Sequence, residues 1–415
     1  MWSLAAKLFL NNVRFRDVEQ KITAVWHPYP VELLMTSQYF VRPDRASVED
    51  FNIFCQQQVN KQDYPLVSEV AEEVLIYDHD VLAQAAATNK HAVLSELHQG
   101  LSYGPGVLVV RGLYQDMDVI DRASAVFETI MADESRTRVQ ADHFSRAGNN
   151  GRIWNALQKL AERSPQTFCD YYANEMLGLI CQAWLGPAWR MTAQVNQVRP
   201  GGEAQQPHRD YHLGFQQGEF VAEFPIPAQI LSQYLTLQGA VAHSDMPLAS
   251  GPTRLLPFSH QYELGYMAYR QPEFVDYFNQ HYVQLPLQKG DGLFFNPALF
   301  HAAGNNTTTD HVRTANLLQI SSAFGVPMED VNHELVLKKI YPQLQDGQYR
   351  AGDFQALIAV AARGYSFPTN LDTDPPLGGM VPKTQQTLVR EALANRWDEE
   401  QFTRALDEHT ARRKG

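Results

Sequence analysis

The chain has 415 residues, of which 44% are hydrophobic and 11% aromatic, enough to pack a core larger than that of one average domain. Its 34 basic and 46 acidic residues give a net charge of −12, which argues against a general nucleic-acid binder and favours a protein with a small-molecule ligand. The sequence contains no run of about 18 apolar residues, so we expect no membrane-spanning helix and no membrane association.

The first 185 residues read mostly as helices. Residues 1–16 predict an amphipathic helix rather than a signal peptide, because Lys7 interrupts the apolar stretch and no small-residue cleavage site follows. Three cysteines without metal-site spacing favour unpaired thiols in a reducing, cytoplasmic compartment. The elements expected next are a helix over 80–100 that Gly100 closes, a strand over 106–113, and helices over 117–136 and 165–185.

Strand-like sequences dominate between Trp189 and Pro327, with Gly, Pro and Asn turns between them. Many closely spaced strands without intervening helices predict a sandwich or jelly roll. Helical spacing then returns in the C-terminal part. The expected strands lie in 190–200, 229–242, 282–297 and 312–324, and the expected C-terminal helices in 353–364 and 384–413.

Two His-x-Asp sequences are present, His208-Arg209-Asp210 and His243-Ser244-Asp245. On a strand, residues i and i+2 point to the same face, so either pair could reach one metal ion. His208 follows a glycine-containing turn after a strand, which suits ligands at a barrel mouth. His243 lies at a strand end, where a histidine bonded to Asp245 is the simpler interpretation. We therefore predict that His208 and Asp210 bind the metal.

His301 is the third predicted ligand. It follows a turn and a strand, and a polar hairpin turn after it would bring Arg313 back towards it. Two imidazoles and one carboxylate form the facial triad that holds Fe(II) and leaves coordination positions open. A planar guanidinium binds a carboxylate with two parallel hydrogen bonds. Together, these residues suggest an oxygenase that uses 2-oxoglutarate.

Four sequence pieces, in this order, resemble the phytanoyl-CoA dioxygenase family of Fe(II)/2-oxoglutarate-dependent oxygenases. They are PGGEAQQPHRDYH, SGPTRLLPFSH, GDGLFFNPALFHAAGNN and HVRTANLLQIS, which together fall within about 190–322. The resemblance implies an α+β fold, a double-stranded β-helix (jelly roll, cupin-like) with flanking helices and with helical N- and C-terminal extensions. We place the extensions at 1–80 and 327–415 and the oxygenase domain at 81–326.

The resemblance also implies the site. Iron would be held by His208, Asp210 and His301, and 2-oxoglutarate by Arg313. Family members often add polar side chains from the strand before the metal-binding turn, here Gln194 and Asn196. A serine common in the family two residues after the third ligand is replaced by Ala303.

Further side chains near these motifs have weaker assignments. His260 belongs to the Ser-His of the second piece and is interpreted as structural. His212 could orient Asp210 or the substrate, or could have no such role. The predicted aromatic wall of the pocket is Tyr211, Phe215 and Trp154.

The sequence thus predicts a cytoplasmic, non-haem dioxygenase that uses Fe(II), 2-oxoglutarate and O₂ to hydroxylate or otherwise oxidise a small organic substrate. Because Asp210 is present, halogenation is disfavoured, since halogenases replace that carboxylate. A metal-dependent cupin without 2-oxoglutarate, or a non-catalytic jelly-roll binding protein, are the alternatives. The extensions could shape or cover the pocket, or form a homodimer contact.

Overall fold

A computed structural model describes residues 39–137, 150–346 and 351–414. The amphipathic helix predicted for residues 1–16 lies outside these ranges. No helix of the described residues is both long and apolar enough to cross a membrane.

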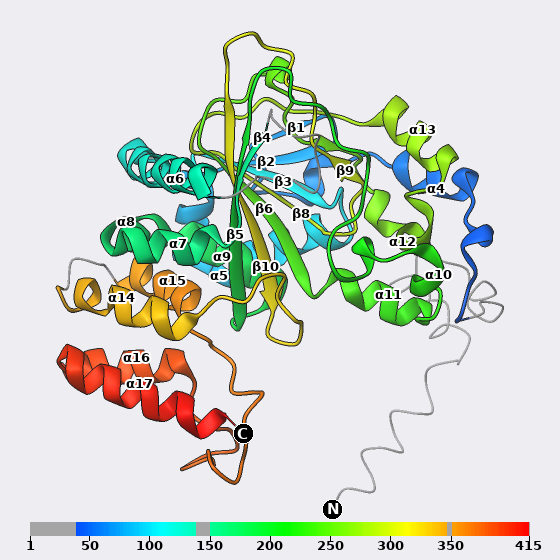
Figure 1. The fold of residues 1–415 in the computed structure, drawn as a ribbon. Helices are drawn as coiled ribbons and strands as arrows, with labels where there is room; N and C mark the ends of the chain where they lie inside the picture. The colour runs from blue at the N-terminus through cyan, green and yellow to red at the C-terminus, as the bar shows by residue number, and fades with distance from the viewer. Residues whose placement is uncertain (1–38, 138–149, 347–350, 415) are drawn as a thin grey trace, which may run out of the picture.

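The centre of the molecule is an eight-stranded sheet with the order β1-β2-β3-β8-β6-β10-β5-β4 (Figure 1). Neighbouring strands are antiparallel except for β2 and β3, which are parallel. The strands are β1 (Glu69–Ala71), β2 (Val74–Asp78), β3 (Val107–Arg111), β4 (Asn150–Ile153), β5 (Trp189–Val198), β6 (Thr236–Ala242), β8 (Gly292–Phe295) and β10 (Arg313–Ser322).

A second, two-stranded sheet joins β7 (Arg254–Leu255) to β9 (His301–Ala302). Apolar side chains from both sheets form one cluster, in which Leu255 of β7 meets Phe295 and Leu293 of β8. Two sheets that enclose a shared interior are the arrangement expected of a jelly roll, so the predicted fold class is confirmed.

Helices cover the other face of the large sheet (Figure 1). The helices before β5 are α4 (Val48–Cys55), α5 (His79–Ser102), α6 (Met117–Thr137), α7 (Ala156–Arg163), α8 (Pro165–Tyr172) and α9 (Glu175–Leu185). Those after it are α10 (Gly218–Val221), α11 (Ile226–Gln233), α12 (Gly265–Ala268), α13 (Pro272–His281), α14 (His333–Gln345), α15 (Ala351–Ala361), α16 (Gln385–Ala394) and α17 (Glu399–Arg413). Short 3-10 turns, at Pro43–Arg45, Lys61–Asp63, His212–Phe215, Leu248–Ser250 and Ser259–Gln261, connect some of them.

The alternation of side chains along β10 separates the two faces. Leu318 and Ile320 pack into the core shared with the helices. Arg313, Ala315 and Leu317 point to the opposite side, where they line a cavity. The long strand therefore carries both the main core and one wall of the site.

Three elements differ from the sequence prediction. Residues 229–233, expected in a strand, belong to helix α11, because Pro225 begins a helix that packs Ile226 and Gln229 inwards. The helix expected over 165–185 is two helices, separated at Ala173 and Asn174. Helix α5 continues to Ser102, two residues past the predicted stop at Gly100.

The predicted 1–80 extension contributes to the sheet. Strands β1 and β2 fall within it, and β2 pairs with β3 through the register Leu75 to Leu108. The described part of this extension has one α-helix of eight residues, α4, so its helical character was overestimated there.

The C-terminal helices pack against the rest of the chain rather than apart from it. The ring of Tyr341 on α14 stacks on Phe402 of α17, with centroids 3.9 Å apart. Leu388 of α16 and Leu406 of α17 belong to the same hydrophobic cluster as the sheet.

Candidate metal centre

His208 and His301 lie side by side because their backbones pair. The two residues form an isolated antiparallel bridge, in which the amide of His208 donates to the carbonyl of His301 at 2.9 Å and the reverse bond is 3.1 Å. Their imidazole rings are 4.4 Å apart between centroids. Segments that are 93 residues apart in the sequence are thus brought to one position.

Each imidazole has a defined tautomer. Nδ1 of His208 bonds to the carbonyl of Gln206 at 2.9 Å, and Nδ1 of His301 to the carbonyl of Leu299 at 2.9 Å. A carbonyl oxygen only accepts, so Nδ1 carries a hydrogen in both rings and Nε2 is the nitrogen left for a metal. Such a bond from the second ring nitrogen is the usual way in which proteins orient histidine ligands.

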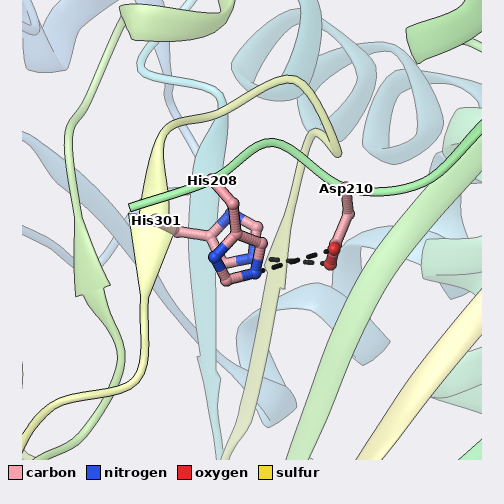
Figure 2. A group of neighbouring side chains, drawn as sticks. All are labelled: His208, Asp210 and His301. Carbon is pink, nitrogen blue, oxygen red and sulfur yellow. Dashed lines mark ion pairs between the residues drawn. The ribbon is translucent and has the colours of Figure 1, made fainter. Parts of the chain in front are cut away.

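Asp210 completes the cluster from the same loop as His208. One carboxylate oxygen, Oδ1, lies 3.7 Å from Nε2 of His208, and the other, Oδ2, lies 3.4 Å from Nε2 of His301. Figure 2 shows the three side chains turned toward one another. The three possible ligand atoms lie within 4.8 Å of one another, in the one such group among the described residues. The amide of Asp210 donates to the carbonyl of Pro297 at 2.9 Å, which fixes the loop to the chain that leads into β9.

Burial and charge prepare these groups for a cation. Burial, with the neighbouring His301, lowers the pKa of His208 to about 4, so this imidazole is neutral near pH 7. Burial alone would raise the pKa of Asp210, but its interactions with the neighbouring His301 and His208 outweigh burial and the pKa is lowered. A neutral imidazole and an ionised carboxylate are the forms that bind a divalent metal. The donor set therefore suits Fe(II).

The second His-x-Asp sequence does not form a comparable cluster. His243 is buried between helices, where Nδ1 bonds to the Ser124 hydroxyl at 2.8 Å and Nε2 to the Tyr171 hydroxyl at 2.9 Å. Asp245 instead accepts from the backbone amide of Lys289 at 2.9 Å. The expected bond between His243 and Asp245 is not among the bonds of the described residues, and both nitrogens of this imidazole are used by hydroxyls.

The side chain of Arg313 lines the same cavity as the metal-binding cluster of His208, Asp210 and His301. Its side chain is 6% exposed, and burial lowers its pKa to about 10, so it stays protonated near pH 7. Within the ranges that the structure describes, no carboxylate and no hydrogen-bond acceptor is paired with this guanidinium. A buried charge without a partner is costly, and an anion that enters the cavity would remove this cost.

Gln194 and Asn196 both line this cavity from β5. The amide oxygen of Gln194 accepts from Nη1 of Arg152 at 2.8 Å. The amide oxygen of Asn196 is buried and has no bonding partner in the described part of the chain. Ala303, which stands where the family often has serine, lines the cavity too, and its amide donates to the side chain of Gln205 at 3.2 Å.

The predicted aromatic wall is only partly present. Phe215 lines the cavity, whereas Trp154 packs under the guanidinium of Arg152 and is not among the lining residues. The hydroxyl of Tyr211 donates to the carbonyl of Pro327 at 3.0 Å, away from the cavity lining.

The two remaining histidines lie apart from the ligand cluster. The ring of His212 contacts that of Tyr211 in a tilted arrangement, with centroids 4.3 Å apart, and no hydrogen bond or ion pair joins it to Asp210 among the described residues. His260 is buried and bonds to the carbonyl of Ser102 at 3.1 Å, the kind of contact expected of a structural histidine.

Sequence reasoning missed several polar residues of the cavity. Arg152 on β4 contacts Gln194, and Gln205 lies three residues before His208. Gln238 of β6 and Gln319 of β10 pair across the sheet and face the same interior. A single glutamine within each of these two largely buried strands was the signal available for the last two.

Comparison with known proteins assigns the chain to a family. The family model described as phytanoyl-CoA dioxygenase matches residues 103–315, half of the chain and the part that contains His208, Asp210, His301 and Arg313. "Dioxygenase cdmD" of Talaromyces verruculosus is 23% identical over 242 residues, which are 55% of this chain and 74% of that protein. "Dioxygenase trt7" of Aspergillus terreus is 30% identical over 139 residues, 34% of this chain and 43% of that protein.

Among solved structures, the epimerase SnoN from nogalamycin biosynthesis, described as non-heme and alpha-ketoglutarate-dependent, matches with 18% identity. The match covers 56% of this chain and 82% of that one, with a TM-score of 0.40. The family model is the stronger finding, because it covers half of the chain, from the end of α5 to the start of β10, and includes the cluster of His208, Asp210 and His301. The chain therefore belongs to the phytanoyl-CoA dioxygenase family of Fe(II)/2-oxoglutarate-dependent oxygenases.

Proposed function

We propose that this protein is a non-haem Fe(II)/2-oxoglutarate-dependent dioxygenase that oxidises a small organic molecule and releases succinate and CO₂. The observation that carries the proposal is the buried guanidinium of Arg313, which opens into the cavity of the His208, Asp210 and His301 cluster without an acidic partner among the described residues. A metal centre alone would not require this cation.

Three side chains would hold the iron. His208 and His301 would bind through Nε2, and Asp210 through its carboxylate, so that the remaining coordination positions are open to cosubstrate and O₂. When bound, Fe(II) supplies the activation of O₂ that organic side chains cannot provide. The protein's part is to hold Nδ1–H of each imidazole on a carbonyl and to keep Asp210 ionised.

Arg313 would anchor the distal carboxylate of 2-oxoglutarate. A guanidinium offers two parallel donors to a carboxylate, and the low exposure of this site makes the pairing stronger than at a surface. Gln194 and Asn196 would orient the same cosubstrate from β5. Their support is their place in the cavity and the unpaired amide oxygen of Asn196.

Hydroxylation is the reaction that we favour. A halogenase needs a free position on the iron for halide, and Asp210 fills the corresponding place. Desaturation, epimerisation and ring formation use the same four residues, so the product decides between them. With excess chloride present, mass spectrometry should show a gain of one oxygen in the product, and incorporated chlorine would refute the role of Asp210.

An anaerobic titration separates this proposal from its two alternatives. Addition of 2-oxoglutarate to the Fe(II)-loaded protein should produce the weak visible charge-transfer band of a keto-acid chelate. A cupin that does not use 2-oxoglutarate would bind Fe(II) without this band. A non-catalytic binding protein would bind neither. Succinate formation under O₂ is the second measurement, and its absence with every substrate candidate and without substrate would contradict the proposal.

The same cavity would hold the iron, 2-oxoglutarate and the reacting part of the substrate. Its volume is about 120 Å³, and its lining combines apolar side chains with amides. The apolar part of the cavity wall includes Leu293, Phe295 and Leu317. The side chains of Gln238 and Gln319 add two carboxamide groups to this wall. We infer a substrate that is mainly apolar with few oxygen-bearing groups.

A further inference from the structure

Arg209, the residue between the two ligands His208 and Asp210, points away from the metal centre into the protein interior. It is 1% exposed and is one of the largest fully buried side chains of the described residues. No carboxylate forms an ion pair with it in the part of the chain that the structure describes. A buried cation that is not paired with an acid is expensive to keep, so its contacts need a reason beyond the filling of space.

The guanidinium of Arg209 is held by two backbone carbonyls and two rings. Nη2 donates to the carbonyl of Ser259 at 2.7 Å and to that of Tyr262 at 3.0 Å. The guanidinium carbon lies 4.9 Å from the ring centroid of Tyr266 and 5.2 Å from that of Phe300. Cation–π contacts of this kind are strongest where water is excluded.

Gly265 provides the room for this side chain. A Cβ atom on Gly265 would lie 1.9 Å from Nη2 of Arg209. The segment that begins α12 is therefore shaped around the guanidinium, which passes directly over its backbone.

Ser259 links Arg209 to the third ligand. While its carbonyl accepts from Arg209, its hydroxyl accepts from the amide of Phe300 at 2.8 Å. Phe300 directly precedes His301 and also lies under the guanidinium. One buried serine thus connects the loop that carries His208 and Asp210 to the strand that carries His301.

We propose that Arg209 is a positioning residue of the metal centre. Through Ser259 and Phe300, it fixes the two ligands on either side of it, His208 and Asp210, relative to His301. The inference rests on the proposed metal centre. Arg209 does not contact the metal itself; it reinforces, from the side away from the metal, the pairing that the backbone bridge between His208 and His301 establishes. Outer contacts that orient metal ligands typically change metal affinity about 10- to 100-fold when they are removed.

Binding of Co(II) alone tests this role without substrate or turnover. The Arg209→Lys variant keeps a positive charge, but its side chain is shorter and lacks the planar guanidinium that lies over the rings of Tyr266 and Phe300. We expect its dissociation constant for Co(II), measured by calorimetry, to rise about 10- to 100-fold. The visible d–d bands of bound Co(II) should change in position or intensity, because the ligand geometry is altered.

Arg190→Lys is the matched control. Arg190 lies on β5, is half-buried and also donates through Nη2 to a backbone carbonyl, that of Gly325, at 2.9 Å. This variant should lose comparable stability yet keep the Co(II) affinity and spectrum of the wild type. A purely structural role for Arg209 would make the two variants alike.

A second variant covers the case in which Arg209→Lys does not fold. Ser259→Ala removes only the hydroxyl that accepts from Phe300, and it should weaken Co(II) binding in the same direction. A folded Arg209→Lys with wild-type affinity and spectrum would overturn the proposal, as would wild-type binding by Ser259→Ala if Arg209→Lys is insoluble. Failure of the wild type to bind Co(II) would refute the metal centre itself, which is a different result.

Discussion

The orientation of each histidine ligand depends on one backbone carbonyl. Nδ1 of His208 and Nδ1 of His301 each bond to the carbonyl two residues earlier, at 2.9 Å in both cases. Since these acceptors belong to the main chain, side-chain substitutions nearby leave them in place. Loss of an imidazole, by contrast, removes a ligand that no neighbouring group can replace.

His208→Ala, Asp210→Ala and His301→Ala should each abolish iron-dependent turnover while the protein stays folded, because two ligands hold Fe(II) poorly. Iron content after anaerobic reconstitution and succinate formation are the measurements. His243→Ala is the control; it should bind iron normally and lose about 1–3 kcal/mol of stability, since it removes the histidine partner of the Ser124 hydroxyl and leaves the Tyr171 hydroxyl with Asn316 alone. Lost iron binding in His243→Ala and normal binding in His208→Ala would show that the wrong motif was chosen.

Arg313→Ala should weaken 2-oxoglutarate binding and leave Fe(II) binding intact. Removal of one partner of a buried charged pair costs about 2–5 kcal/mol, which corresponds to roughly 30- to several-thousand-fold in affinity. Arg313→Lys should also bind poorly, because an ammonium cannot reproduce the two parallel bonds. The measurement is titration of the Fe(II)-loaded protein with 2-oxoglutarate, and unchanged affinity in Arg313→Ala would refute the anchoring role.

At the scale of elements, the predictable parts are those with a strong period or a strong motif. Strands β5 and β10 were predicted because both are strand-like runs separated from their neighbours by Gly, Pro and Asn turns. Residues 229–233 were assigned to a strand because no turn signal separates them from β6, and the helix start that follows Pro225 was overlooked. Short runs of this kind carry no period that separates helix from strand.

The membership of β1 and β2 in the sheet was not predictable from local sequence. Strand β1 has three residues and pairs only with β2, and the place of β2 in the sheet is set by its pairing with β3, about 30 residues later in the chain. Arg152 was missed for the same reason, since only the pairing of β4 with β5 brings it next to Asn196. The four residues of the iron and cosubstrate motif were predictable because their chemistry, and not their packing, limits the choice.

The contact of α17 with α14 bears on the predicted domain boundary at residue 327. Phe402→Ala should lower the free energy of unfolding by about 3–5 kcal/mol, because Phe402 is fully buried against Tyr341. Since both rings belong to the core that contains the sheet, we expect one cooperative transition in urea, with Co(II) binding unchanged. Phe367→Ala, at an exposed ring, is the control and should change stability by less than about 0.5 kcal/mol. Two separate transitions would instead show an independent C-terminal unit.

At the scale of the whole molecule, buried neutral histidines link stability to pH. Burial lowers the pKa of His243 and of His260 to about 3, and that of His333 to about 4, from 6.5. Between pH 6.5 and these lower values, the imidazoles of the unfolded chain bind protons that those of the folded protein do not. The stability that the neutral imidazoles contribute is therefore fully present above about pH 6.5 and decreases as the pH falls.

Urea unfolding near neutrality and in the acid range should therefore show a midpoint that decreases steadily from about pH 6.5 to about pH 4. His333→Gln, which can still donate to the carbonyl of Ala361, should flatten this dependence because one of the titrating imidazoles is gone. A midpoint that does not change over this range would contradict the assignment of these imidazoles as neutral in the folded protein.

The backbone bridge between His208 and His301 has a consequence for the timing of metal uptake. Its two hydrogen bonds, 2.9 and 3.1 Å long, do not involve any ligand atom, so they form when the chain folds and without waiting for iron. The loss of conformational entropy that comes with ordering His208 and His301 therefore occurs during folding, and the ion binds to two imidazoles that are already in place. In the metal-free protein the amides of His208 and His301 should accordingly exchange with deuterium as slowly as those of the central strands, and iron should add little to their protection.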